Sequence, residues 1–539
     1  MTAARFRTMR AGNLPPGSVR TLLLVMLGAF STTAQAQPLA SVPAAAEAAS
    51  PVAPADGDEK TTQKPAWVLT PRLTLGATYS DNAGLSDANK RADWIAEISP
   101  GLRLSGESAR LKAFVDYTRR ELMYARDSDR KNSQNSLNAF GTFKAVEQLL
   151  FVDFSAGISQ QAISAFGTQS SGATLNNANE TETRTVRLSP YLKGELGSFA
   201  NYELRYSATS MRTASATASG MDQDEWLAKL EGATPFSRIQ WAFDAAHQTY
   251  DYTLGRETES SNARLRLSYL VDTGLKLTAI GGREENNFIS LNKESHNTSG
   301  FGLEWNPTTR TRLFLERERR FFGNSHRFSF SHRTPRTAVN FSDTRSVAAS
   351  PNNLAGGGAG NIYDLLFQQM ASVEPDPVQR DILVNNFLQA NGIAPNTPVT
   401  SGFLNSGPTV SRQQTLSFAW LGVRNTLTLT ATQGETQRLG LLTAAGEDLA
   451  ASGTVRQRGV SLALSHKLSA LSNLSFQASR QSSSSASGLS TSTRNFNLSL
   501  IHKLGPNTAM TVGMRRVLFD NQLNPYTENA FLGTLRMQF

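Results

Sequence analysis

Basic side chains recur along this chain at alternate positions of segments rich in apolar residues, a spacing that puts them on one face of a strand. Turned toward a water-filled pore, such a face favours anionic solutes. Acidic residues such as Asp116, Glu203 and Glu304 are interleaved with the basic ones, and any water-filled barrel has polar walls. Two interpretations stay open, a track for an anionic polymer such as a polyuronate and an ordinary polar wall. The expected pore-lining residues are Arg103, Lys112, Arg187, Arg205, Arg264, Arg266, Lys276, Arg312, Arg515 and Arg536.

Few residues support any other chemistry. The chain has 0 Cys, which excludes disulfides, thiolate metal sites, Cys nucleophiles and a lipoprotein anchor. Its 6 His are scattered, and the sequence holds no HExxH, GxSxG, Walker A or dinucleotide-binding motif. Asp127 and Asp129 are compatible with a Ca²⁺ site, but such a cluster is more typical of a turn. We expect no catalytic residue, no cofactor and no metal site.

Composition limits how the chain meets a membrane. With 39% hydrophobic residues and a mean hydropathy of −0.32, its 539 residues are too polar for a helical membrane protein. The only long uncharged apolar run covers 21–30, too short to cross a bilayer, which needs about 20 residues. Four preceding Arg and the Ala34-Gln35-Ala36 site identify 1–36 as a signal peptide, with an uncleaved anchor as the alternative. Its removal lowers the formal charge from +9 to +5, which does not favour nucleic-acid binding.

The mature chain has two regions with different sequence patterns. Residues 37–66 are rich in Ala, Pro and charged residues without periodicity, which predicts a disordered periplasmic leader, too short to hold a plug domain like that of a TonB-dependent transporter. From Trp67 to Phe539 the chain alternates apolar and polar residues in segments of about ten, typical of an outer-membrane β-barrel. The last segment ends on an aromatic residue, which we expect the barrel-assembly machinery to recognise. The apolar face of that signal consists of Phe531, Leu535, Met537 and Phe539.

Turn chemistry sets the expected strand count. Nine short turns join strands in pairs, and one further strand at each end of 67–539 gives 20, within a range of 16–22. The fold class is therefore all-β, a transmembrane antiparallel up-and-down barrel with both ends in the periplasm. The short turns are predicted at 105–109, 144–148, 194–198, 234–237, 271–273, 306–309, 421–424, 468–471 and 505–507.

One segment departs from the alternation. Residues 322–411 contain a Gly-rich run and two stretches with helical character, 361–370 and 377–391. We expect this partly helical insertion on the extracellular side. Because an apolar helix face must be covered, it either plugs the lumen or caps the rim from outside.

The run Glu316-Arg-Glu-Arg-Arg320 marks where a strand leaves the membrane. As a strand it puts Glu316, Glu318 and Arg320 on one face and the two remaining arginines on the other. A charge on the lipid face at mid-depth costs about 2–4 kcal/mol. Arg317 and Arg319 are therefore expected above the apolar band.

Several short stretches resemble a known family. They are Tyr79-Ser-Asp-Asn82, Glu97-Ile-Ser-Pro-Gly101, Tyr124-Ala-Arg-Asp-Ser-Asp129, Leu149-Leu-Phe-Val-Asp153 with Ile158-Ser-Gln-Gln161, and Tyr363-Asp-Leu-Leu366. In order and spacing the chain from Trp67 to Phe539 is similar to outer-membrane β-barrel proteins associated with the PEP-CTERM/exosortase system, which accompany exopolysaccharide genes. The resemblance implies an outer-membrane component of exopolysaccharide production or export, and it brings no catalytic residues.

Three functions remain open from the sequence. A conduit for exopolysaccharide, working with periplasmic export components, agrees best with the long insertion. A general porin for small solutes would not need that insertion. A barrel enzyme would need Ser, His and an acid clustered at one rim. The expected partners are outer-membrane lipid, the barrel-assembly machinery, the polymer and periplasmic export components, and we expect no binding of nucleic acid.

Overall fold

The computed structural model describes residues 67–126, 132–170, 175, 177–349, 384, 402–440 and 448–539. The predicted signal peptide 1–36 and leader 37–66, the residues Asp127 and Asp129, and the insertion's helical stretches apart from Val384 lie outside these ranges.

The described chain is almost entirely β-sheet, with one short helix, α4 (Asp448–Ser452). Among its residues no helix combines the length and apolar character needed to span a membrane. The strands are β1(Trp67–Ser80), β2(Asp93–Glu107), β3(Leu111–Tyr124), β4(Asn132–Val146), β5(Leu150–Ala162), β6(Glu180–Leu196), β7(Ala200–Thr213), β8(Met221–Ala233), β9(Ile239–Tyr252), β10(Thr258–Leu270), β11(Leu275–Asn286), β12(Glu294–Thr308), β13(Thr311–Arg320), β14(Gly323–Arg333), β15(Thr337–Ala348), β16(Thr409–Leu421), β17(Asn425–Arg438), β18(Thr454–Lys467), β19(Ser472–Ser485), β20(Ser490–Lys503), β21(Thr508–Asn521) and β22(Tyr526–Gln538).

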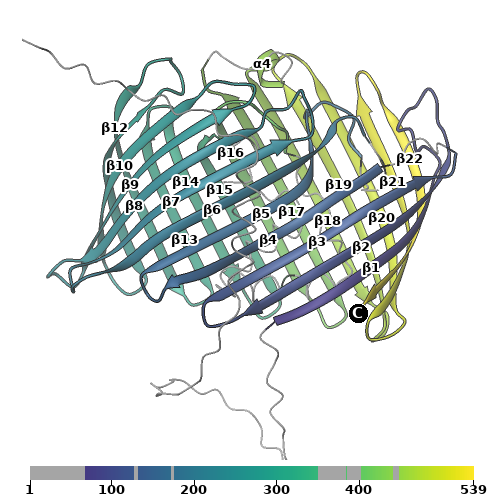
Figure 1. Cartoon of the computed structure of the whole chain (residues 1–539), viewed down its shortest axis with the longest axis horizontal. Helices are drawn as coiled ribbons and strands as arrows, with labels where there is room; N and C mark the ends of the chain where they lie inside the picture. Colours follow the sequence, from purple (N-terminus) through teal and green to yellow (C-terminus); the bar gives the residue numbers. More distant parts are fainter. Residues whose placement is uncertain are drawn as a thin grey trace, which may run out of the picture. The chain divides into compact units, whose positions relative to one another are not determined.

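The 22 strands form one closed antiparallel sheet in which each strand pairs with its neighbours in sequence. The ring closes where β1 pairs with β22, from Arg72 opposite Gln538 to Ser80 opposite Ala530. The Phe539 amide adds a hydrogen bond to the Pro71 carbonyl, 3.0 Å away. In Figure 1 the C-terminus accordingly lies beside the start of β1.

The strand count corrects the predicted value of 20. Residues 322–411, predicted as one insertion, begin with the hairpin β14–β15, and β15 ends at Ala348 while β16 begins at Thr409. The nine predicted short turns coincide with turns of the barrel, and a tenth, at 334–336, joins β14 to β15. Thr334 organises this turn, because its hydroxyl accepts hydrogen bonds from the amides of Arg336 and Thr337 at 3.3 and 3.0 Å.

The two faces of the sheet differ in polarity, as the period of two requires. On β21 Met510, Val512 and Met514 are exposed, whereas the alternate residue Arg515 is buried. The same alternation of exposed apolar and covered polar residues recurs around the ring. Because a closed sheet leaves no unpaired edge, this apolar belt suits it to hydrocarbon, and the chain is an outer-membrane β-barrel.

A buried ion pair reinforces the closing seam. Arg515 donates to both carboxylate oxygens of Glu528, at 2.8 and 3.2 Å, and the two side chains are 8% and 0% exposed. The Ser80 hydroxyl donates to the same carboxylate at 2.9 Å. Three strands, β21, β22 and β1, therefore meet at one carboxylate.

We predict that Glu528→Ala destabilises the barrel by about 3–5 kcal/mol, because it leaves Arg515 buried without a counter-charge. Urea unfolding in detergent measures the change. The matched control is Glu435→Ala, which breaks the pair with Arg456 whose side chains are 40% and 61% exposed and should cost about 1 kcal/mol or less. Equal losses for the two variants would contradict a special role of the seam.

Candidate functional site: the lumen and its mouth

By the period of two, the ten predicted pore-lining residues fall on the face of their strands opposite the exposed apolar belt, which is the inward face. Nine of them form an ion pair with an acidic side chain. The tenth, Arg536, lies on the inward face of β22, opposite Thr74 of β1. Arg72 lies two residues before Thr74, on the same face of β1.

The first cluster lies where β1, β2 and β3 meet. The Arg103 guanidinium donates to Asp116 at 2.7 and 2.9 Å, and Arg72 donates to the same carboxylate. Arg72 also donates to the Thr118 hydroxyl at 3.0 Å. One carboxylate thus holds two arginines, and the sequence analysis had not identified Arg72 as pore-lining.

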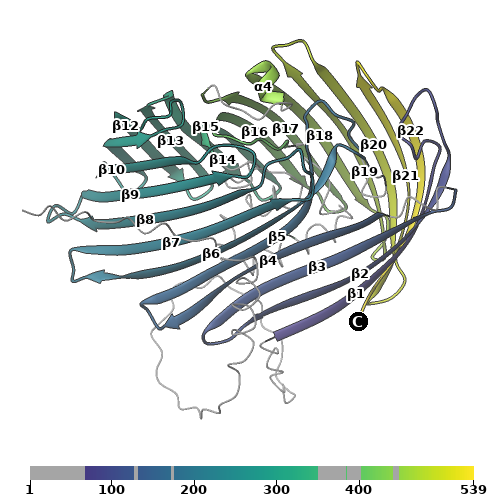
Figure 2. The ribbon, with the colours of Figure 1, turned by 45° about the horizontal axis from the view of Figure 1, so that its top comes forward.

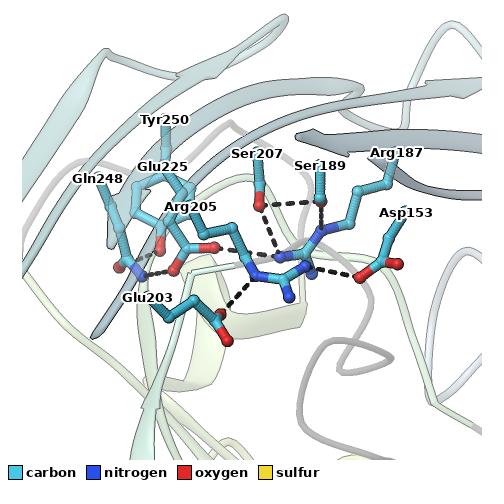
Figure 3. Close-up of polar contacts among 9 residues, drawn as sticks. All are labelled: Asp153, Arg187, Ser189, Glu203, Arg205, Ser207, Glu225, Gln248 and Tyr250. Carbon is cyan, nitrogen blue, oxygen red and sulfur yellow. Dashed lines mark hydrogen bonds and ion pairs between the residues drawn. The ribbon is translucent and has the colours of Figure 1, made fainter. Parts of the chain in front are cut away.

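A longer network crosses β5 to β9, and Figure 3 shows its side chains pointing toward one another. Arg205 donates to Asp153 at 2.8 Å and to Glu203 at 2.9 Å. Arg187 donates to Glu225 at 3.2 Å and to the Ser207 hydroxyl at 3.1 Å. The Glu225 carboxylate also accepts from Gln248 at 2.6 Å, and Gln248 accepts from Tyr250 at 2.7 Å.

The third group spans β9 to β13. Lys276 and Arg312 share the Glu304 carboxylate at 2.9 and 2.8 Å. The remaining pairs are Arg264 with Glu318, Arg266 with Asp244, and Arg320 with Glu284. Because the cations are neutralised at close range, these pairs argue against a continuous positive track along this wall.

The opposite part of the wall carries no charge over its central height. From β15 to β20 one row of directly opposed inward residues runs Asn340, Ser417, Thr430, Ser461, Ser479 and Asn495. The next row toward the extracellular end runs Ser342, Thr415, Thr432, Gly459, Gln481 and Thr493. We call these two rows the hydroxyl-amide wall. The sequence analysis missed it because it searched for charged residues.

Loops from one side of the ring reach the other side across the mouth. The β5–β6 loop begins at Ile163, and its Ser164 hydroxyl and Ala165 amide donate to the Asp448 carboxylate of α4 at 2.7 and 2.6 Å. Asn521, at the end of β21, donates to the Phe166 carbonyl at 2.7 Å. Figure 2, with the mouth turned forward, shows α4 at the rim above β17 and β18.

Apolar residues bury these crossings. Phe166 packs with Leu449 of α4 and with Phe403, which belongs to the chain entering β16. Farther along the rim, loop residues Leu85 and Leu175 pack on the inward-facing Tyr526. The loop segments that carry Leu85, Phe166 and Leu175 therefore fold over the mouth.

The end of the insertion also crosses the mouth. Phe403 forms a bridge with Ala162, and the Leu404 amide donates to the Ala162 carbonyl at 3.2 Å, although β5 and β16 occupy opposite sides of the ring. Asn405 and Ser406 are buried. Because the chain from Phe403 to Thr409 spans at most about 21 Å, the two walls approach each other here. At its other end, Ala349 accepts a hydrogen bond from Tyr252 of β9.

The Asp448 carboxylate is the charged group in the described contacts between α4 and the β5–β6 loop. Burial raises its pKa, because the hydrogen bonds from Ser164 and Ala165 offset only part of the lost hydration. The closed contact therefore favours the protonated acid more than a solvated loop would.

The described residues contain no group of three or more His, Asp or Glu side chains placed to hold a metal ion.

No protein-family profile and no curated protein sequence matches this chain. Among solved structures, the FrpB iron transporter from Neisseria meningitidis (F3-3 variant) is similar with a TM-score of 0.49 and 8% identity, covering 89% of this chain and 82% of that one. The siderophore receptor PirA from Pseudomonas aeruginosa gives a TM-score of 0.44 and 10% identity, with coverages of 89% and 82%. At these values no residue role and no ligand is transferred to this chain.

We predict that Asp448→Ala loosens the mouth. Loss of two hydrogen bonds to a charged or polarised group, about 1.5–3 kcal/mol, should raise the ratio of open to closed mouths about 10- to 150-fold. Single-channel conductance in planar bilayers measures that ratio. Asp87→Ala, at an exposed loop carboxylate paired with Lys90, is the control and should leave conductance unchanged.

The raised pKa of Asp448 predicts a pH dependence. The part of closure that is linked to protonation of Asp448 is complete below the ordinary pKa of about 3.9 and is lost as the pH rises through the raised value. Openings should therefore become rarer on acidification of the extracellular side. Asp448→Asn should remove this component, and an unchanged pH profile in that variant would contradict the assignment.

Proposed function

We propose that this outer-membrane β-barrel is a gated conduit for a carbohydrate polymer, serving exopolysaccharide production or export. The observation that carries the proposal is the hydroxyl-amide wall, whose rows continue across six neighbouring strands without a charged residue. Directly opposed side chains on such strands lie about 4.5–5.5 Å apart at Cβ. The wall therefore presents closely spaced hydrogen-bonding groups around this side of the ring, and a polymer in the lumen can contact several of them at once.

Sugars suit this surface chemically. Each hydroxyl of a sugar both donates and accepts hydrogen bonds, as do the Ser and Thr hydroxyls of the wall, and the Asn amides offer both functions as well. Each contact contributes only about 0.5–1.5 kcal/mol net. Many weak sites in series let a polymer enter without becoming trapped, which is the requirement for conduction.

The ion-paired wall complements this role. The pairs of Arg187 with Glu225 and of Arg264 with Glu318 tie together strands that are not adjacent, so they stiffen their side of the ring. A barrel of 22 strands has a wide lumen that would leak solutes if unobstructed. The loops over the mouth supply the obstruction, and we propose that the insertion as a whole acts as the plug.

The partners follow from the same proposal. The family resemblance supports a place among exopolysaccharide proteins, with periplasmic export components delivering the polymer. We assign recognition by the barrel-assembly machinery to the outward face of β22, where Phe531 and Phe539 are 59% and 70% exposed. Leu535 and Met537 alternate between them on the same face.

A channel for small solutes is the alternative, and the charged half of the wall favours it. Polar, mixed-charge linings are ordinary in such channels. Polymer length separates the two functions: a small-solute channel passes monosaccharides but shows no residence time that grows with chain length. A barrel enzyme would shorten or modify the polymer, which mass analysis of the recovered polymer detects.

We predict that the triple variant Thr430→Val, Ser461→Ala, Ser479→Ala shortens the residence of neutral oligosaccharides about 5- to 50-fold, because three wall hydroxyls are lost. Transient current block in planar bilayers measures residence, using Asp448→Ala as the open background. The control, Arg266→Gln with Asp244→Asn, removes the ion pairs of Arg266 with Asp244 and Glu316 from the other wall and should leave residence unchanged. Equal residence in the triple variant and its parent would contradict the proposal.

A further inference from the structure

A group of arginine side chains makes the outside of the barrel positively charged over β18 to β21. On β19 the outward side chains run Leu474, Phe476 and Ala478 from the periplasmic end and then reach Arg480. Each of the other three strands likewise has an arginine as its first polar outward residue above the apolar positions. These residues, here called the arginine cluster, are Arg458, Arg480, Arg494 and Arg516.

Strand register brings the cluster together. Arg480 and Arg494 are direct cross-strand partners. Arg458 pairs with Ser482, and Arg516 pairs with Phe496, so each is one diagonal step from the central pair. Diagonal neighbours lie about 7–8 Å apart, within reach of a single anion held between long side chains.

The protein does not neutralise this cluster. All four side chains are exposed, and within the described chain none of them forms an ion pair. Two outward acids each lie one diagonal step from a cluster arginine, Asp520 from Arg494 and Glu435 from Arg458, and neither makes an ion pair with it, since Glu435 pairs with Arg456. Like charges directly opposite each other destabilise a sheet, so this arrangement has a cost that an external anion can offset.

Several outward arginines on other strands have acidic partners. Arg119 pairs with Glu121 at 2.5 Å, Arg184 with Glu182 at 2.7 Å, and Arg212 with Asp222 at 2.7 Å. The four arginines of the cluster differ from these paired arginines, because none of them has an acidic partner among the described contacts.

The depth of the cluster identifies the anion. The short turns lie at the periplasmic end, so the cluster sits on the extracellular side of the apolar belt, where headgroups of the outer leaflet lie. Directly below it Leu462, Phe476 and Leu498 offer a surface for acyl chains. A free anion would need only the arginines, whereas a lipid uses both surfaces.

We propose that the arginine cluster is a binding site for a phosphate-bearing lipid headgroup of the outer leaflet. A guanidinium forms paired hydrogen bonds with a phosphate, and two opposed arginines can hold one phosphate from two sides. The opposed hydroxyls of Ser482 and Ser492 are additional donors at the extracellular edge of the site. This site is independent of any transport through the lumen.

The test compares the full-length protein with R480Q/R494Q. The probe is lipid A carrying two phosphates, and native mass spectrometry measures how much stays bound after transfer to detergent. We expect the double variant to retain about 10- to 100-fold less, through loss of charge-assisted contacts. The matched control R119Q/R184Q removes two outward arginines that have acidic partners and should retain the lipid as the parent does.

A second readout separates binding from folding. Without lipid A, R480Q/R494Q should be as stable as the parent or more stable in urea, because the like-charge repulsion is gone. With lipid A, only the parent and the control should gain stability. Equal retention by R480Q/R494Q, equal retention of fully dephosphorylated lipid A, or the same stabilisation by inorganic phosphate alone would each overturn the proposal.

Discussion

In hydrocarbon no water is present to pair with backbone N–H and C=O groups, so a sheet that crosses a membrane must close on itself. Here closure depends on the pairing of β1 with β22, two strands from the opposite ends of the described chain. Their register fixes which residues face the lumen, because a slip of one residue would exchange the two faces. The contact of Ser80 and Arg515 with Glu528 lies across this seam and matches only one register.

The barrel could be predicted from sequence because its signals are local. Nine short turns were identified from Gly, Asn, Ser and Pro chemistry, and they coincide with turns of the barrel. The hairpin β14–β15 was missed for an equally local reason. The turn that leads from β13 into this hairpin is Phe321-Phe322, two bulky residues followed by Gly323 with a φ of +100°, and not the Asn-Gly type of turn. The alternation of Phe328 and Phe330 with serines was a strand signal that the insertion hypothesis obscured.

Within the lumen, the sequence predicts which residues face inward but not which of them contact each other. Period two is enough to place Arg187 and Arg264 on the inward face. Their partners, Glu225 and Glu318, lie 38 and 54 residues away, and only the register and curvature of intervening strands bring them together. The rows of the hydroxyl-amide wall have the same origin, since no single strand shows that Thr430 and Ser461 are opposed. Ser and Thr are also common on any polar face of a strand. Their number therefore does not indicate a continuous wall, whereas their alignment across neighbouring strands does.

The two halves of the wall and the mouth are mechanically related. The β5–β6 loop leaves the ring between strands whose inward residues Asp153 and Arg187 belong to the ion-paired network, so its base is anchored in the stiffer half. Its contacts are made on α4 and on the ends of β20 to β22, above or beside the hydroxyl-amide wall. These contacts are polar apart from the packing around Phe166 and that of Leu175 on Tyr526, whereas the base is held by cross-linked ion pairs. Movement should therefore begin at the α4 end of the loop, and an opening mouth would expose the uncharged wall before the charged one.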